Sequence, residues 1–292
     1  MYSSCAIVDS GIFPKLEREE ENVMKKVLSI LAAVAMVISL VACGNNSSGQ
    51  GSSEEQIPMS NDEIKQMYAD VNEFKGRTIE LTGKIFGSID YDSDGVYFQM
   101  YADPANYEMN TVVAYGNPDA ELSDGDYVKV IGKVSGEFEG ENMLGAKITA
   151  PVITADSAEV LTYQDAVAPT LYTYIPNEST LTQNGYSVTV EKVELAEQET
   201  RVYIKVENNG AGKFNLYSFN SLIIQNGKQY EEEMNYEADY PDVQTDLSVG
   251  VSTEGIFTFP AIENADFQII LEGSSDNWSE DFESFTYNVS VS

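Results

Sequence analysis

The sharpest group of oxygen-bearing side chains is a short run of aspartates. Asp90, Asp92 and Asp94 alternate along the chain, and Gly95 follows them. Carboxylates at this spacing before a glycine collect oxygen ligands in calcium-binding loops. The position that closes a twelve-residue calcium loop is Tyr101, where a bidentate glutamate is needed. A weak calcium site is still compatible with this pattern. The pattern favours a hairpin loop in which the aspartates form Asx turns.

A second acidic stretch runs from Glu231 to Asp246 and interleaves carboxylates with tyrosines. Its acidic residues are Glu231, Glu232, Glu233, Glu237, Asp239, Asp242 and Asp246. A charge run of this kind is usually a solvated loop. Binding of hydrated cations or of a basic partner is the functional alternative, and it depends on charge density alone.

Three polar side chains share one face of a predicted strand. Tyr97, Gln99 and Tyr101 alternate with the apolar residues at positions 96, 98 and 100. We expect Tyr115 to extend this polar face from the next strand. Tyrosine offers a ring for stacking on a sugar or base and a hydroxyl for hydrogen bonding. A ligand face therefore competes with cross-strand aromatic pairing, which is the commoner use of such residues.

Catalysis has little support in this sequence. The chain contains no histidine, which excludes Ser-His-Asp triads, His-ligated zinc and histidine general bases. No phosphate-binding glycine loop or nucleophile elbow is present. A pair of carboxylates that hydrolyses glycosides is still compatible with the sequence, but no spacing between acidic residues identifies such a pair. We expect a protein that is not an enzyme and has no cofactor, with a glycan-acting enzyme as an unfavoured alternative.

The charge balance argues against one class of partner. The 292 residues include 48 acidic and 16 basic ones, for a net charge of −32. Such a surface repels phosphate backbones, so we expect no nucleic-acid binding. Of the acidic residues, 22 lie in 43–167 and 21 in 168–292. The acidity is therefore spread over the whole chain and marks no single site.

The N-terminal region carries an export signal. Met24 begins a short basic start, and residues 27–40 form an apolar stretch that is too short to span a bilayer. The segment Leu40–Cys43 resembles the lipobox of bacterial lipoproteins, with all four positions matching. The resemblance implies cleavage before Cys43 and a diacylglyceryl group on its thiol.

This resemblance divides the N-terminal region into three parts. Residues 1–23 fit no signal and are interpreted as a mis-assigned upstream extension. Residues 24–42 are the lipoprotein signal peptide, and residues 43–56 are the lipidated cysteine and a flexible polar tether. We therefore expect the protein at the cell membrane, anchored by lipid on the extracytoplasmic face.

The region 57–165 is predicted to form a helix followed by strands. Ser60 and Glu63 make a capping box, and apolar residues then recur at helical spacing as far as Val71. From Arg77 onward, apolar residues recur at every second position, which predicts five strands separated by glycine-containing turns. Glycines inside these strands are expected at bends. The region resembles the OB-like domains of lipid-anchored proteins of Gram-positive bacteria, although the stretch after Tyr115 is too short for their usual helix.

A second β-rich region is predicted at 181–292, after a linker at 166–180. Its short strands are regularly spaced, and Asn226 with Gly227 predicts a hairpin. The stretch Val202–Gly210, together with the strand Gly255–Phe259, is similar to Ig-like accessory domains of Firmicute lipoproteins. That resemblance implies an Ig-like β-sandwich and assigns no activity.

Together these features predict a mostly β chain, with an OB-like five-stranded barrel and N-terminal helix followed by an Ig-like β-sandwich. We expect a lipid-anchored, non-catalytic binding or interaction protein that is monomeric. Its partner would be an envelope protein or glycan. A calcium-dependent surface or adhesion module, using Asp90, Asp92 and Asp94, is the alternative.

Overall fold

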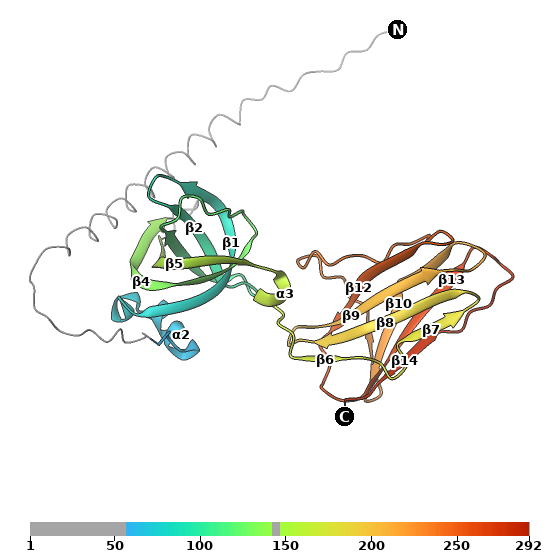
Figure 1. The fold of residues 1–292 in the computed structure, drawn as a ribbon. Coiled ribbons are helices and arrows are strands. Elements are labelled where there is room, and N and C mark those ends of the chain that lie inside the picture. The colour runs from blue at the N-terminus through green and yellow to red at the C-terminus, as the bar shows by residue number, and fades with distance from the viewer. Residues whose placement is uncertain (1–56, 142–146, 292) are drawn as a thin grey trace, which may run out of the picture. The chain divides into compact units, whose positions relative to one another are not determined.

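A helix, a closed barrel and a two-sheet sandwich follow one another along the chain in the computed structural model, which describes residues 57–141 and 147–291 (Figure 1). The expected signal peptide, tether and lipidated Cys43 lie outside the described residues. No helix within the described ranges has the length and apolar character needed to cross a membrane.

Helix α2 (Asn61–Ala69) begins at the predicted capping box. The Glu63 N–H donates to Ser60 Oγ (3.4 Å), and the Ser60 N–H donates to Glu63 Oε2 (2.9 Å). The bond from the Ser60 N–H and a second one from Arg77 lower the pKa of Glu63 to about 2. The helix is followed by the 3₁₀ turn η1 (Val71–Phe74), and both bury their apolar residues in the barrel core.

Five strands form the barrel. They are β1 (Thr78–Tyr91), β2 (Val96–Asp103), β3 (Glu108–Tyr115), β4 (Tyr127–Glu141) and β5 (Lys147–Leu161). Their order is β1-β2-β3-β5-β4, and β4 returns to pair with β1, which closes the sheet. The β3–β5 pair is parallel and the others are antiparallel. The predicted OB-like five-stranded barrel is confirmed.

Two glycines allow barrel strands to approach closely, and one of them lies at a strand irregularity of the kind that the sequence predicted. Gly132 lies opposite Ala155 at an irregularity in the β4–β5 ladder. A Cβ at Gly132 would lie 2.3 Å from the carbonyl oxygen of Thr154. A Cβ at Gly83 would lie 2.7 Å from the carbonyl oxygen of Tyr101. Both positions therefore exclude any side chain.

The connection after the barrel is shorter than predicted. Helix α3 (Tyr163–Ala166) follows β5, and the strand β6 (Tyr172–Tyr174) pairs with the sandwich strand β8. Part of the expected linker at 166–180 thus belongs to a sandwich sheet. Three residues are too few to show a period, which is why the sequence did not indicate this strand.

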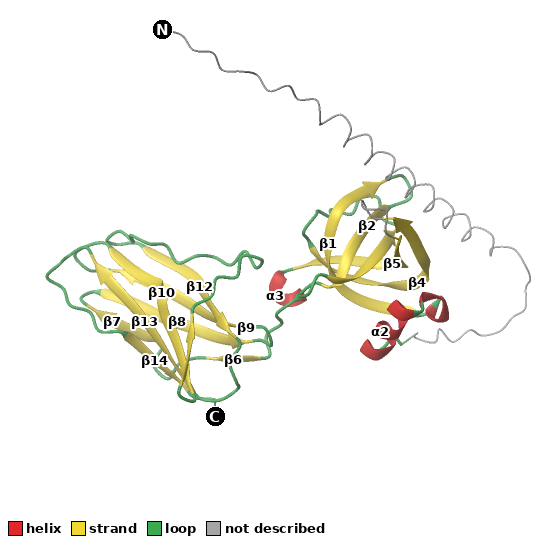
Figure 2. Ribbon diagram, turned by 180° about the vertical axis from the view of Figure 1, so that it is seen from behind, coloured by secondary structure: helices red, strands yellow, loops and turns green. Residues whose placement is uncertain are grey.

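Two packed sheets make up the rest of the described chain (Figure 2). One has the order β11-β10-β13-β14 and the other β12-β9-β8-β6, with β7 paired to β8. The strands are β7 (Thr180–Gln183), β8 (Tyr186–Leu195), β9 (Glu199–Asn208), β10 (Phe214–Gln225), β11 (Lys228–Glu231), β12 (Ser252–Pro260), β13 (Phe267–Ser275) and β14 (Phe285–Val289).

The sandwich core and one of its turns match the predicted pattern. The inward residues of β8, β9, β13 and β14 form one buried cluster. Asn226 and Gly227 have φ values of 51° and 74°, as the tight β10–β11 hairpin requires. The predicted β-sandwich is therefore present.

Candidate functional site

The outer surface of the barrel gathers three aromatic rings. Tyr101 stacks on Phe86 of the neighbouring strand, with ring centroids 3.9 Å apart and planes 14° apart. Tyr107 meets Tyr101 edge-on at 5.9 Å. Tyr97, Gln99 and Tyr101 alternate with buried residues along β2, as predicted. We call Phe86, Tyr101 and Tyr107, with Gln99 and Asn110 beside them, the barrel aromatic face.

Two amides lie within this face. Asn110 is directly opposite Tyr101, and its Nδ2 donates to Gln99 Oε1 at 3.4 Å. Asn110 Oδ1 is shielded from solvent, and no described group donates a hydrogen bond to it. A shielded acceptor without a donor costs about 1–3 kcal/mol. Such an atom in a folded protein calls for an explanation, and a ligand donor is one.

The hairpin beside the face has an unusual backbone. Tyr107 and Met109 have φ values of 55° and 61°, in the left-handed region that non-glycine residues rarely adopt. Each such residue costs on the order of 1–3 kcal/mol, and such residues cluster at ligand-binding sites. Tyr107 is also 48% exposed. The rings of the face are therefore supported by a strained turn and remain partly accessible.

One cation borders the barrel aromatic face. Lys84 Nζ lies 5.4 Å from the Tyr107 ring centroid and 5.2 Å from that of Tyr127. It also forms an ion pair with Glu237. Partial burial disfavours the charged ammonium and is the largest single effect on the pKa of Lys84, but Glu237, Tyr127 and Tyr107 together outweigh it and raise that pKa above its ordinary value. Lys84 is therefore a fixed positive charge at the rim of the face.

Tyr115 does not extend the polar face. It lies directly opposite Val96 in the β2–β3 ladder, whereas Ala114 lies opposite Tyr97. Tyr115 is therefore on the core side, where it packs against the barrel core. The predicted placement of Tyr115 is wrong because the β2–β3 turn sets the register, and a shift of one residue reverses the face.

The aspartate loop between β1 and β2 is a turn held by its own side chain. Asp92 Oδ1 accepts from the N–H groups of Asp94 (2.8 Å) and Gly95 (3.1 Å). Asp90 is part of β1 and lies opposite Tyr97. Across the described ranges, no three acidic or cysteine side chains are grouped so that they could hold a metal ion. The geometry matches the Asx-turn interpretation, and nothing in it favours calcium.

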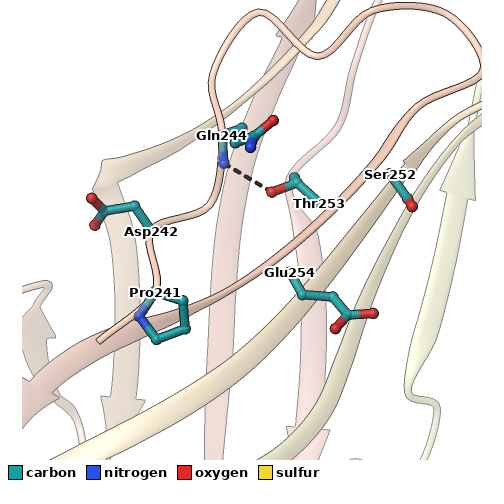
Figure 3. A pocket seen from close by; sticks show the side chains of 6 residues that line it. All are labelled: Pro241, Asp242, Gln244, Ser252, Thr253 and Glu254. Carbon is teal, nitrogen blue, oxygen red and sulfur yellow. Dashed lines mark hydrogen bonds between the residues drawn. The ribbon is translucent and has the colours of Figure 1, made fainter. Parts of the chain in front are cut away.

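The second acidic stretch is attached to the sandwich along its length. The Glu233 N–H donates to the Thr258 carbonyl (2.8 Å), and Asn235 Nδ2 donates to Glu199 (2.7 Å). Three residues of the stretch, Pro241, Asp242 and Gln244, line an open polar groove (Figure 3). The other lining residues are Ser252, Thr253 and Glu254 of β12. The Asp242 and Glu254 side chains point away from one another in Figure 3. In this view the two carboxylates do not converge on one point of the groove.

A buried ionic network centred on Arg201 was not indicated by the sequence. The Arg201 side chain is 0% exposed. Its Nε donates to Glu194 (3.1 Å), and its Nη1 donates to Glu199 (2.8 Å) and to the Ala168 carbonyl (2.8 Å). Its Nη2 donates to the Thr170 hydroxyl (2.8 Å). Arg201 therefore attaches the chain leaving α3 to the sandwich.

Tyrosines and a lysine complete this network. The hydroxyls of Tyr203 and Tyr240 donate to Glu194 (3.0 Å) and Glu199 (2.6 Å), and Lys192 pairs with Glu194 at 2.5 Å. Burial raises the pKa of Tyr240, and the Glu199 carboxylate raises it further. Because the guanidinium and both carboxylates are satisfied by protein groups, we interpret the network as structural. The only sequence signal for it was an arginine inside an apolar strand.

Comparison with known proteins adds no assignment. A scan against protein-family models, a search of curated proteins and a search of solved structures each returned no match.

Proposed function

We propose that this protein is a lipid-anchored, extracytoplasmic, non-catalytic binding protein whose ligand site is the barrel aromatic face. The observation that carries the proposal is the Asn110 acceptor, shielded and without a donor, beside the rings of Phe86 and Tyr101. The positive φ values of Tyr107 and Met109 in the β2–β3 hairpin are a second support. Aromatic rings beside an unpaired amide oxygen form the kind of surface that fixes a small polar ligand.

An envelope glycan is the ligand class that this face fits best. The apolar side of a sugar ring would stack on an exposed aromatic ring, and a sugar hydroxyl would donate to Asn110 Oδ1. The protein's net charge of −32 disfavours anionic polymers. Because Asn110 Oδ1 is shielded, the long Gln99–Asn110 hydrogen bond must open as the ligand enters.

Replacing the central ring should weaken ligand binding. We expect Tyr101→Ala to reduce the affinity for soluble peptidoglycan fragments about tenfold, or about 1.4 kcal/mol, because the stacking platform is lost. Isothermal titration calorimetry with the purified protein measures this. Asn110→Ala should also bind less tightly, whereas Tyr172→Ala, which removes an exposed sandwich tyrosine, should bind as the wild type does. Equal affinities for all four proteins would disprove the site.

The lipid anchor has its own test. We expect Cys43→Ala to move the protein from the membrane fraction to the soluble fraction, because the acyl chains supply the membrane affinity. Cell fractionation and metabolic labelling with palmitate measure this. A small polar residue of the tether is the matched control, and Ser47→Ala should leave the protein attached. A Cys43→Ala protein that stays in the membrane fraction would rule out the anchor.

A further inference from the structure

Several connections of the sandwich meet at one of its ends. The loop between β13 and β14 is joined to the β7–β8 turn by a bond from Asn184 Nδ2 to the Asp281 carbonyl (2.9 Å). It is joined to the β9–β10 loop at Lys213, whose N–H donates to Asp276 Oδ1 (2.7 Å). The Asp276 N–H donates back to the Lys213 carbonyl (3.0 Å). The β13–β14 loop is therefore anchored to its neighbours on both sides.

The same loop is also braced internally around Asn277. The Asn277 N–H donates to Ser275 Oγ (3.2 Å), and Asn277 Nδ2 donates to Glu280 Oε1 (3.0 Å). The Glu280 N–H donates to the Asn277 carbonyl (3.0 Å), which closes a tight turn over the two residues between them. This turn holds the backbone at Trp278 in one conformation.

Trp278 is the only tryptophan of the chain, and its side chain is 100% exposed. Tryptophan is one of the residues enriched among those that contribute most to binding at protein interfaces. A fully solvated indole adds nothing to the packing of the sandwich. Because the turn beneath it is braced, little backbone entropy is left to lose when the indole binds a partner.

The charge around Trp278 specifies what could bind there. Asp276, Asp281 and Glu283 are exposed in the same loop, which includes Glu280 as well and has no lysine or arginine between positions 276 and 284. Carboxylates around an exposed indole suit a cationic partner, since lysine and arginine are attracted to the indole face. They oppose contact with an anionic membrane surface. A neutral sugar would leave the carboxylates unpaired.

We propose that the β13–β14 loop, residues 276–284, docks a basic segment of another protein. An arginine or lysine of that segment stacks on Trp278, and its neighbouring cations pair with Asp276, Asp281 and Glu283. This interaction is independent of the barrel aromatic face, so the protein would hold its glycan ligand and its protein partner at separate places.

The single tryptophan makes the proposal directly measurable. With purified full-length protein, we expect an octaarginine peptide to quench the indole emission and to protect Trp278 from acrylamide. Octalysine should bind more weakly, because the planar guanidinium stacks better than an ammonium. Trp278→Ala should lose about tenfold in octaarginine affinity by calorimetry. Its thermal unfolding should be unchanged, since the ring packs against nothing.

A matched control separates stacking from general charge attraction. Tyr236 is also exposed, at 88%, and lies within the other acidic stretch. Tyr236→Ala should bind octaarginine as the wild type does. Equal loss in both variants, or no loss in Trp278→Ala, would overturn the proposal. A change of indole emission with phosphatidylglycerol vesicles but not with octaarginine would also overturn it, in favour of membrane contact.

Discussion

Replacing Arg201 with alanine is expected to destabilise the sandwich by about 3–5 kcal/mol. The substitution leaves the carboxylates of Glu194 and Glu199 buried without their guanidinium, and removing one partner of a buried ion pair is costly for that reason. It also frees the Ala168 carbonyl and the Thr170 hydroxyl. Urea denaturation measures the change in the free energy of unfolding.

The same strand provides a control for this substitution. Lys205 forms an exposed ion pair with Glu207 at 3.6 Å, and Lys205→Ala should change stability by less than about 1 kcal/mol. A triple variant, Arg201→Met with Glu194→Gln and Glu199→Gln, should recover part of the stability that Arg201→Ala loses, because no charge stays buried. If the triple variant is no more stable than Arg201→Ala, lost packing rather than buried charge is the cause.

Acid should weaken this network in the wild type. Burial of Glu194 opposes its charged form, but hydrogen bonds from Lys192, Tyr203 and Arg201 outweigh burial and hold its pKa below the ordinary value of 4.5. Stability from the ionised carboxyl is therefore present above about pH 4.5 and is lost as the pH falls through the lower folded pKa. The Arg201→Ala variant should therefore lose less stability on acidification than the wild type does.

Replacing Gly132 with alanine is expected to cost about 3 kcal/mol or more in barrel stability. The new Cβ would lie 2.3 Å from the Thr154 carbonyl oxygen and 2.8 Å from the Ala155 Cα, which are backbone atoms that no rotamer change can move. The β4–β5 ladder must separate locally, as in other overpacked cores. Denaturation followed by far-ultraviolet circular dichroism measures the loss, and hydrogen exchange locates it.

Gly136 provides the matched control on the same strand. A Cβ at Gly136 would meet no atom within 4 Å, and its φ is not in the left-handed region. We expect Gly136→Ala to be neutral or slightly stabilising, since alanine restricts the unfolded chain. Similar losses for the two variants would show that close strand approach at Gly132 is not what the barrel requires.

Local patterns in the sequence were sufficient to predict most of the framework. The Ser60–Glu63 capping box, the alternation along β2 and the Asn226–Gly227 hairpin each depend on a few neighbouring residues. The same holds for the glycine bend at Gly132, where strand alternation made a lone glycine informative. These features need no knowledge of which strands pair.

The candidate site could be predicted only in part, because it depends on pairing. Tyr101 was identified from its own strand, but its stacking partner Phe86 lies on β1, and no local pattern joins them. Tyr115 was placed on the wrong face because the β2–β3 hairpin sets the register, and its backbone has positive φ at Tyr107 in the turn and at Met109 in β3. The burial of Arg201 requires covering segments around Ala168 and Tyr240 that are distant in sequence.

The parallel β3–β5 pair has a consequence for the order in which the chain folds. It joins Val112 to Val152, with the whole of β4 between them, so the loop between the two strands must close before their contacts form. Pairing across such sequence distances slows folding. Until β5 is available, β3 and β4 remain open strand edges that can pair with other chains. The chain must therefore be available as far as Ala155, the last paired residue of the β3–β5 ladder, before its barrel is protected from aggregation.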